Sequence, residues 1–187
     1  MKSFWIAIFC LFVSQTALEA QCNSHHSRKQ AKHVSYTHGK DIVELAAGSD
    51  QLNTLVVAVK AADLVSTLQS DGPFTVFAPT NTAFAKLPEG TVSTLLEPGN
   101  KKQLQSVLTY HVVAGEFTAK DIVTAIQSSG GSFKVKTVQG DILTARMSGE
   151  SVILEDARGG IVAVTNTDID ATNGVVHIID GVVLPKA

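Results

Sequence analysis

Two histidines are the residues of this chain whose type and setting could support catalysis. His111 or His177 could act as a general base, which requires a nucleophile within hydrogen-bond reach and a third group that orients the ring. The chain contains no G-x-S-x-G nucleophile elbow and no H-E-x-x-H zinc motif. We therefore expect both histidines to make fixed hydrogen bonds at the edge of the core, and we expect no catalytic residue and no enzymatic activity.

An acidic segment at residues 166–170 could instead bind a partner. An exposed aspartate beside an apolar residue, as in Asp168-Ile169, can complete the coordination shell of a metal ion that a receptor holds. The alternative interpretation is an ordinary acidic strand end or turn.

The same segment resembles the start of a calcium-binding loop. Asn166, Asp168 and Asp170 stand at ligand spacing, but Ala171 replaces the expected glycine. His177 occupies the twelfth position, where a calcium loop carries glutamate. We therefore expect no bound metal and no cofactor.

The first 20 residues have the pattern of a secretory signal peptide. Lys2 precedes an apolar run from Phe4 to Val13, and Ala20 offers a small residue for cleavage. Residues 21–38 are polar and histidine-rich, with a spacing that matches no closed zinc site, so we expect a flexible leader. These features predict a secreted, extracellular or periplasmic protein.

Cys22 would be the sole cysteine of the mature chain, because Cys10 lies in the signal sequence. No intrachain disulfide is then available. Cys22 could carry a lipid, although Gln21 fits a lipoprotein cleavage site poorly; it could also stay free or form intermolecular disulfides. The net charge of −2 offers neither the basic face of a nucleic-acid binder nor a polybasic signal for anionic membranes.

Helical patterns dominate the first half of the remaining chain. Leu52, Leu55 and Val59, for example, fall on one helical face. We expect helices or helical turns at residues 41–46, 52–59, 64–68, 81–86, 91–96, 101–109 and 118–126, with extended chain at 75–78 and 110–113.

After Gly130-Gly131 the pattern changes to strands separated by turns. We expect strands at residues 133–138, 142–146, 151–154, 161–167 and 175–184. Helices followed by strands predict a single α+β domain over residues 39–187, with the helices packed on an antiparallel sheet or β-wedge.

Three blocks of this pattern resemble the fasciclin domain, an extracellular adhesion module. They are Phe74 to Phe84, Tyr110-His111, and Ala171 to Pro185, in the order and spacing of that family. The resemblance covers roughly residues 41–185, which is nearly the whole mature chain.

Most residues of these blocks are expected to be architectural. Pro79 lacks an N–H donor and would end a strand, after which Thr80 or Asn81 can cap a helix. Asn173-Gly174 is a turn pair that tolerates positive φ. The expected structural set is Phe77, Pro79, Thr80, Asn81, Phe84, Asn173, Gly174 and His177.

The resemblance implies a secreted or cell-surface module for adhesion or extracellular-matrix interaction. Its implied partners are extracellular or cell-surface proteins or polysaccharides, with weak self-association, and with membrane attachment only through Cys22. Nucleic acid is not an expected partner. The alternative is a periplasmic protein that binds a small ligand or lipid between helices and sheet, which requires an apolar cavity of roughly a few hundred Å³.

The resemblance also suggests where a partner would bind. In vertebrate members the position of Asp168-Ile169 carries an Asp-Ile pair that looks like an integrin contact. Here Thr167 and Asp170 replace the lysine and leucine that flank that pair. The expected partner-binding residues are Asp168, Ile169, Tyr110 and His111.

Overall fold

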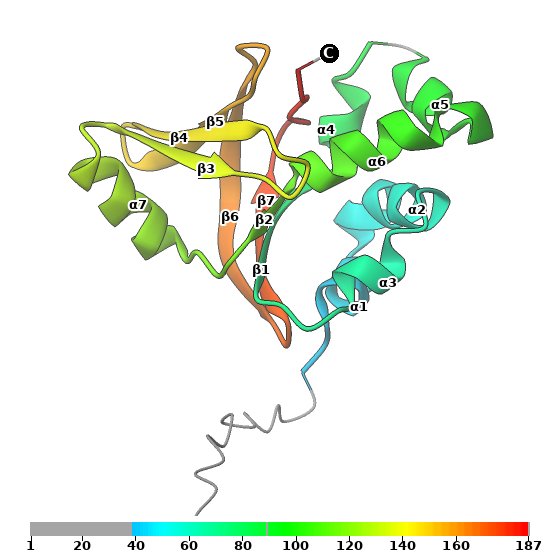
Figure 1. Ribbon diagram of the computed structural model, residues 1–187, viewed down its shortest axis with the longest axis horizontal. Coiled ribbons are helices and arrows are strands. Elements are labelled where there is room, and N and C mark those ends of the chain that lie inside the picture. Colours follow the sequence, from blue (N-terminus) through cyan, green and yellow to red (C-terminus); the bar gives the residue numbers. More distant parts are fainter. Residues whose placement is uncertain (1–38, 89, 187) are drawn as a thin grey trace, which may run out of the picture. The chain divides into compact units, whose positions relative to one another are not determined.

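The computed structural model of the protein describes residues 39–88 and 90–186 (Figure 1). The expected signal peptide at 1–20 and leader at 21–38 lie outside the described residues. Among the helices that the structure describes, none is long and apolar enough to cross a membrane.

Helices make up most of the first half of the domain, as expected. The α-helices are α1 (Ile42–Ala47), α2 (Asn53–Ala61), α3 (Val65–Leu68), α4 (Asn81–Ala85), α5 (Thr91–Leu96), α6 (Lys101–Tyr110) and α7 (Ala119–Ser128). Two 3₁₀ turns, η1 (Asp50–Leu52) and η2 (Pro98–Asn100), precede α2 and α6. Local capping sets several starts: Asp41 with Glu44 forms a capping box at α1, and Thr118 with Asp121 forms one at α7.

Strands make up most of the second half, and two earlier strands join them. The strands are β1 (Phe74–Pro79), β2 (Val112–Ala114), β3 (Ser132–Lys136), β4 (Ile142–Ser148), β5 (Ser151–Glu155), β6 (Ile161–Ala171) and β7 (Gly174–Ile179). They form one sheet in the order β2-β1-β7-β6-β5-β4-β3. The expected α+β class is confirmed, and the antiparallel order holds from β3 to β7.

The centre of the sheet departs from the antiparallel pattern. β1 and β7 run parallel, from the pair Phe74 and Gly174 to the pair Pro79 and Ile179. β2 then adds to β1 in antiparallel fashion, and an isolated bridge joins Val113 to Thr137, just after β3. This bridge brings the two edges of the sheet together, so the sheet is barrel-like.

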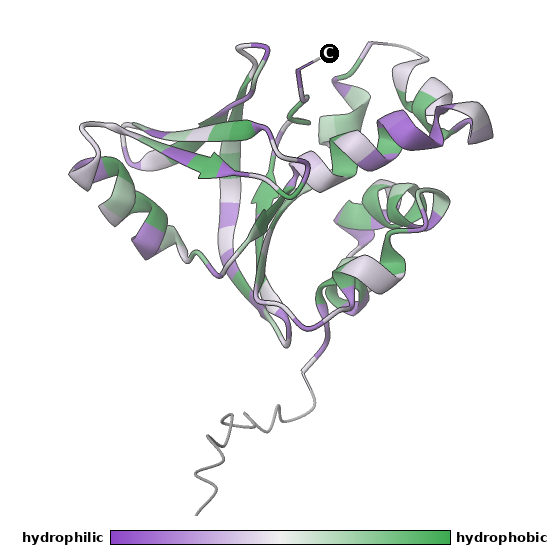
Figure 2. Ribbon diagram, viewed as in Figure 1, coloured by the Kyte–Doolittle hydropathy of each residue, from purple (hydrophilic) through white to green (hydrophobic). Residues whose placement is uncertain are grey.

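β1 and β7 are buried on both faces and separate two apolar clusters. Side chains alternate along a strand, so Val76 and Ala78 face the helical core, whereas Phe77 faces the sheet core. The helical core is filled mainly from α1, α2, α4 and α6, and the sheet core from α7 and β4 to β6. Figure 2 shows the two apolar strands between these layers.

Several expected boundaries differ from the structure. The strand expected at residues 161–167 continues to Ala171 as β6, and the strand expected at 133–138 ends at Lys136 as β3. Tyr110, expected in extended chain, is the last residue of α6. The final strand, expected to reach residue 184, ends at Ile179. Residues 182–186, which we call the C-terminal segment, follow without regular secondary structure although Val182, Val183 and Pro185 are buried.

Candidate functional site

His111 joins the end of α6 to the C-terminal segment. The residue is 2 % exposed, and its Nδ1 lies 2.8 Å from the carbonyl oxygen of Val107. A carbonyl only accepts, so Nδ1 carries the proton, and Nε2 accepts from the N–H of Val183 at 3.2 Å. Burial lowers the pKa of His111 to about 4, although the Val107 bond and the charge of Asp156 act in the opposite direction. The ring is therefore neutral near pH 7.

Tyr110 is buried in the interior, as His111 is. Its side chain is fully buried, its hydroxyl donates to the carbonyl of Ile142 at 2.9 Å, and it accepts from the N–H of Ala157 at 3.1 Å. Because neither ring of the Tyr110-His111 pair reaches the surface, the pair offers no side chain to a protein partner. The expected partner contact at Tyr110 and His111 does not agree with the burial of both side chains.

His177 makes a second buried junction. Its Nε2 donates to the carbonyl of Phe117 at 2.8 Å, and its Nδ1 accepts from the N–H of Asp168 at 3.2 Å. The ring also stacks on Phe77, with 5.6 Å between the ring centroids. Both nitrogens of each buried histidine are thus engaged by backbone groups. The expectation of fixed hydrogen bonds is confirmed for His111 and His177, and neither ring has a nitrogen free to act as a general base.

Asp168 lies on an irregular stretch of β6. Two register shifts, one between Val164 and Asn166 and one between Asn166 and Ile169, take β6 out of step with β7. Asp168 has a φ of 57°, in the left-handed region that aspartate tolerates better than most residues. β-bulges re-aim side chains in this way.

The carboxylate of Asp168 fastens β6 to α7. Its Oδ1 accepts from the N–H of Ala119, the first residue of α7, at 2.7 Å. A negative charge there also interacts favourably with the helix dipole. Asp168 is nevertheless exposed, and within the described part of the chain its Oδ2 has no hydrogen bond.

The side chain of Ile169 points in a different direction from that of Asp168. It is half-buried and packs against the helical core, whereas the carboxylate of Asp168 lies at α7. The structure therefore does not present the Asp168-Ile169 pair as one exposed contact, and of the two residues only Asp168 is fully accessible.

The first and last blocks position the helices on the sheet. Thr80 caps α4 by accepting from the N–H of Ala83 at 3.2 Å. Asn81 instead reaches α2, where its side-chain oxygen accepts from the N–H of Thr54 at 2.9 Å. The sequence left the choice of capping residue open, and the structure assigns it to Thr80.

Asn173 and Gly174 have structural roles in the last block. The side chain of Asn173 accepts from the N–H of Ile42 at 3.1 Å and donates to the carbonyl of Leu68 at 2.6 Å, so it ties α1 and α3 to the hairpin of β6 and β7. A Cβ on Gly174 would lie 1.9 Å from the carbonyl oxygen of Phe74, so only glycine fits there.

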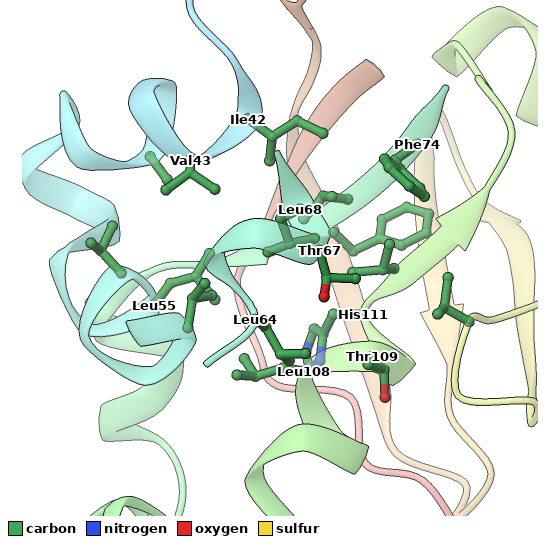
Figure 3. A pocket seen from close by; sticks show the side chains of 17 residues that line it. Ile42, Val43, Leu55, Leu64, Thr67, Leu68, Phe74, Leu108, Thr109 and His111 are labelled. Atoms are coloured by element: carbon green, nitrogen blue, oxygen red, sulfur yellow. The ribbon is translucent and has the colours of Figure 1, made fainter. Parts of the chain in front are cut away.

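An apolar cavity of about 50 Å³, which we call the helical cavity, lies between α1, α2 and α3 on one side and β1 and α6 on the other (Figure 3). Its lining is almost entirely aliphatic or aromatic. Ten of its residues are labelled in Figure 3: Ile42, Val43, Leu55, Leu64, Thr67, Leu68, Phe74, Leu108, Thr109 and His111.

Comparison with known proteins assigns the domain. A family model described as the fasciclin domain matches residues 50–185. The chain belongs to the fasciclin domain family. The resemblance seen in the sequence is thereby confirmed, and the three blocks that carried it fall on β1 with α4, on the end of α6, and on β7 with the C-terminal segment.

Several fasciclin-domain relatives are similar over most of this chain. It is 50 % identical over 144 residues to protein sll1483 of Synechocystis sp., covering 77 % of this chain and 73 % of that protein. It is 31 % identical over 184 residues to transforming growth factor-beta-induced protein ig-h3 of Sus scrofa, covering 95 % of this chain and 25 % of the relative.

A solved structure shares the fold. A FAS1 domain pair from the insect cell adhesion molecule fasciclin I matches with a TM-score of 0.69 at 22 % identity, covering 78 % of this chain and 51 % of that chain.

Sequence reasoning missed one organising residue of this fasciclin domain. Asp156 is 9 % exposed, and its carboxylate accepts from the N–H groups of Arg158, Gly160 and Leu184 at 2.9, 2.7 and 3.0 Å. The sequence showed it only as the residue before an Ala-Arg-Gly-Gly turn. Its bond to Leu184 links residues 28 positions apart and leaves no local pattern.

Proposed function

We propose that this fasciclin domain is a secreted or cell-surface module for adhesion or extracellular-matrix interaction, and that it is not an enzyme. It binds a protein or polysaccharide outside the cell. Membership of the fasciclin domain family supports this class of function, as does the shared fold with fasciclin I, a cell adhesion molecule.

The observation that carries the proposal is a firmly held polar surface on β6. Thr165, Asn166, Thr167 and Asp168 are four successive exposed residues on the irregular stretch of that strand. The backbone of Asp168 is fixed by His177, and its carboxylate is fixed by Ala119. A surface that is already ordered loses little conformational freedom on binding, which favours affinity.

Asp168 is the centre of this surface. One carboxylate oxygen of this exposed residue holds α7, while the other has no hydrogen bond within residues 39–88 and 90–186. That oxygen is suited to a cationic side chain of a partner or to a metal ion held by a receptor. The contact rests on Asp168 rather than on Ile169, whose side chain packs inward.

The alternative function, carriage of a small ligand or lipid, is not favoured for a ligand of drug size or a long acyl chain, because the helical cavity is too small. Pockets that bind drug-sized ligands have volumes of roughly 300–1,000 Å³. The helical cavity has about 50 Å³, which is too little for such a ligand or for a long acyl chain.

Asp168→Asn separates the binding role of Asp168 from its structural role. The amide oxygen of asparagine can still accept from the Ala119 N–H, and asparagine also tolerates positive φ, so the fold is retained. Only the charge is lost. Beads coated with the variant should adhere to the surface of the producing cells roughly tenfold more weakly than beads coated with wild type, as expected for a contact of about 1.4 kcal/mol.

Glu150→Gln is the matched control, because it removes the same charge from an exposed residue in the turn between β4 and β5. It should leave adhesion unchanged. Equal adhesion by wild type and Asp168→Asn would remove Asp168 from the binding surface, and absence of adhesion by the wild type would contradict the proposed function.

A further inference from the structure

The interior of the helical cavity offers no polar atom to a ligand. Apolar side chains from α1, α2, α3, β1 and α6 form most of its wall, and the one ionisable residue in the lining is His111. Both ring nitrogens of His111 are bonded to backbone groups of Val107 and Val183. A hydroxyl or charge placed deep in this cavity would find no partner, and leaving it unsatisfied is strongly unfavourable.

The polar atoms of the lining belong to its outer residues. Thr67 on α3 is exposed, and so is Val138 at 44 %, whereas Thr109 at the end of α6 is half-buried. The hydroxyl of Thr109 already donates to the carbonyl of Gln105 on its own helix, at 2.7 Å. Because Thr67 lines the cavity and is exposed, the cavity reaches the surface on that side, and an apolar chain end can enter while a polar end stays in water.

The volume limits the length of chain that can enter. An apolar cavity of roughly 150 Å³ takes up benzene, which has six carbon atoms, so about 50 Å³ admits only the last two or so carbon atoms of a chain. Apolar cavities stay dry and take up apolar molecules, because an empty space deprives its lining of dispersion contacts.

We propose that the helical cavity is a binding site for the end of a short aliphatic chain of a small free amphiphile, which enters tail first and leaves its polar end in water beside the exposed Thr67. The site lies in the helical half of the domain and uses none of the residues of the β6 surface. It therefore stands independently of the adhesive function.

A pair of four-carbon probes tests the site. Titration of the domain with 1-butanol should shift the backbone amide resonances of cavity residues such as Val59 and Leu108 in a saturable way. Titration with 1,4-butanediol should shift them at least about tenfold less at equal concentration, because its second hydroxyl would be buried without a partner. Equal responses to the two probes, or a response to 1-butanol that never saturates, would overturn the proposal.

Matched variants locate the response. Ala46 lines the cavity and is 9 % exposed, so the side chain of Ala46→Leu should fill the space and abolish the saturable shifts. Ala47→Leu makes the same change at the next, exposed position of α1 and should bind 1-butanol as wild type does. Should Ala46→Leu fail to fold, Val56→Leu fills the same cavity from α2. Saturable shifts that persist in a folded cavity-filling variant would contradict the assignment.

Discussion

His111 joins two segments of the domain only while its ring is neutral. Protonation would place a second N–H at Nε2, facing the N–H of Val183, in a site that is shielded from water. The family's Tyr-His block therefore contributes a buried hydrogen-bond junction at this position. Its chemistry is that of a structural histidine with a lowered pKa.

The lowered pKa of His111 predicts a pH dependence of stability. The pKa is about 4 in the folded state and 6.5 in the unfolded state, so between these values the unfolded chain binds more protons. The contribution of His111 to the free energy of unfolding is thus complete above pH 6.5. It falls by about 3 kcal/mol as the pH drops from 6.5 to 4.

Urea unfolding at a series of pH values between 4 and 8 measures this loss. His111→Gln removes the titrating group and should be less stable at pH 7 than wild type, with a visibly shallower decline toward pH 4. Parallel declines for wild type and His111→Gln would show that His111 does not produce the effect.

The C-terminal segment is the element whose position depends most on side chains. His111, Asp156 and Asp141 accept from the N–H groups of Val183, Leu184 and Lys186, and Arg158 donates to the carbonyl of Pro185 at 2.9 Å. These four bonds take the place of a strand ladder, which ends with β7 at Ile179.

Asp156→Ala tests that arrangement. It would leave the N–H groups of Arg158, Gly160 and Leu184 without their acceptor, and we expect a loss of about 3 kcal/mol in the free energy of unfolding. Amide hydrogen exchange should accelerate first at residues 182–186. Asp141→Ala removes only the bond to Lys186 and should have a much smaller effect on both readouts.

Unchanged exchange in the C-terminal segment of Asp156→Ala would show that buried apolar side chains alone hold that segment. Similar losses for Asp156→Ala and Asp141→Ala would contradict the distinction between the two carboxylates.

Element types were predictable from the sequence, whereas their pairing was not. Periodicity and turn residues placed α2, α7 and β4 close to their observed bounds, because those signals are local. The parallel pairing of β1 with β7 joins residues about 100 positions apart, and no local pattern encodes its direction. The end of β7 was missed for a related reason: Val182 and Val183 are buried like strand residues, but the N–H of Val183 donates to the side chain of His111 instead of to a neighbouring strand.

The candidate site was likewise predictable in its residue types but not in its long-range contacts. Asp168 could be singled out by its residue type beside Ile169 and by the family resemblance, yet its bond to Ala119 and its separation from the side chain of Ile169 depend on two register shifts in β6. The helical cavity has no sequence signature, because its lining comes from distant segments that share only apolar character.

At the scale of the whole molecule, the family's blocks build the scaffold, and we propose that binding occurs at a different surface. Phe77, Tyr110 and His177 are buried, whereas residues 165–168 are exposed on the irregular stretch of β6. The central claim is therefore that this fasciclin domain binds an extracellular partner through that stretch.

Site-specific photocrosslinking at the native cell surface tests this claim most directly. A crosslinking residue at Thr167, beside Asp168, should capture a discrete partner whose yield falls when unlabelled wild-type domain competes and when Asp168→Asn is added to the probe. The crosslinking residue placed instead at Gln103, which is exposed on α6, should capture little of that partner. Equal capture from both positions, or capture from Thr167 that neither competition nor Asp168→Asn reduces, would contradict the account.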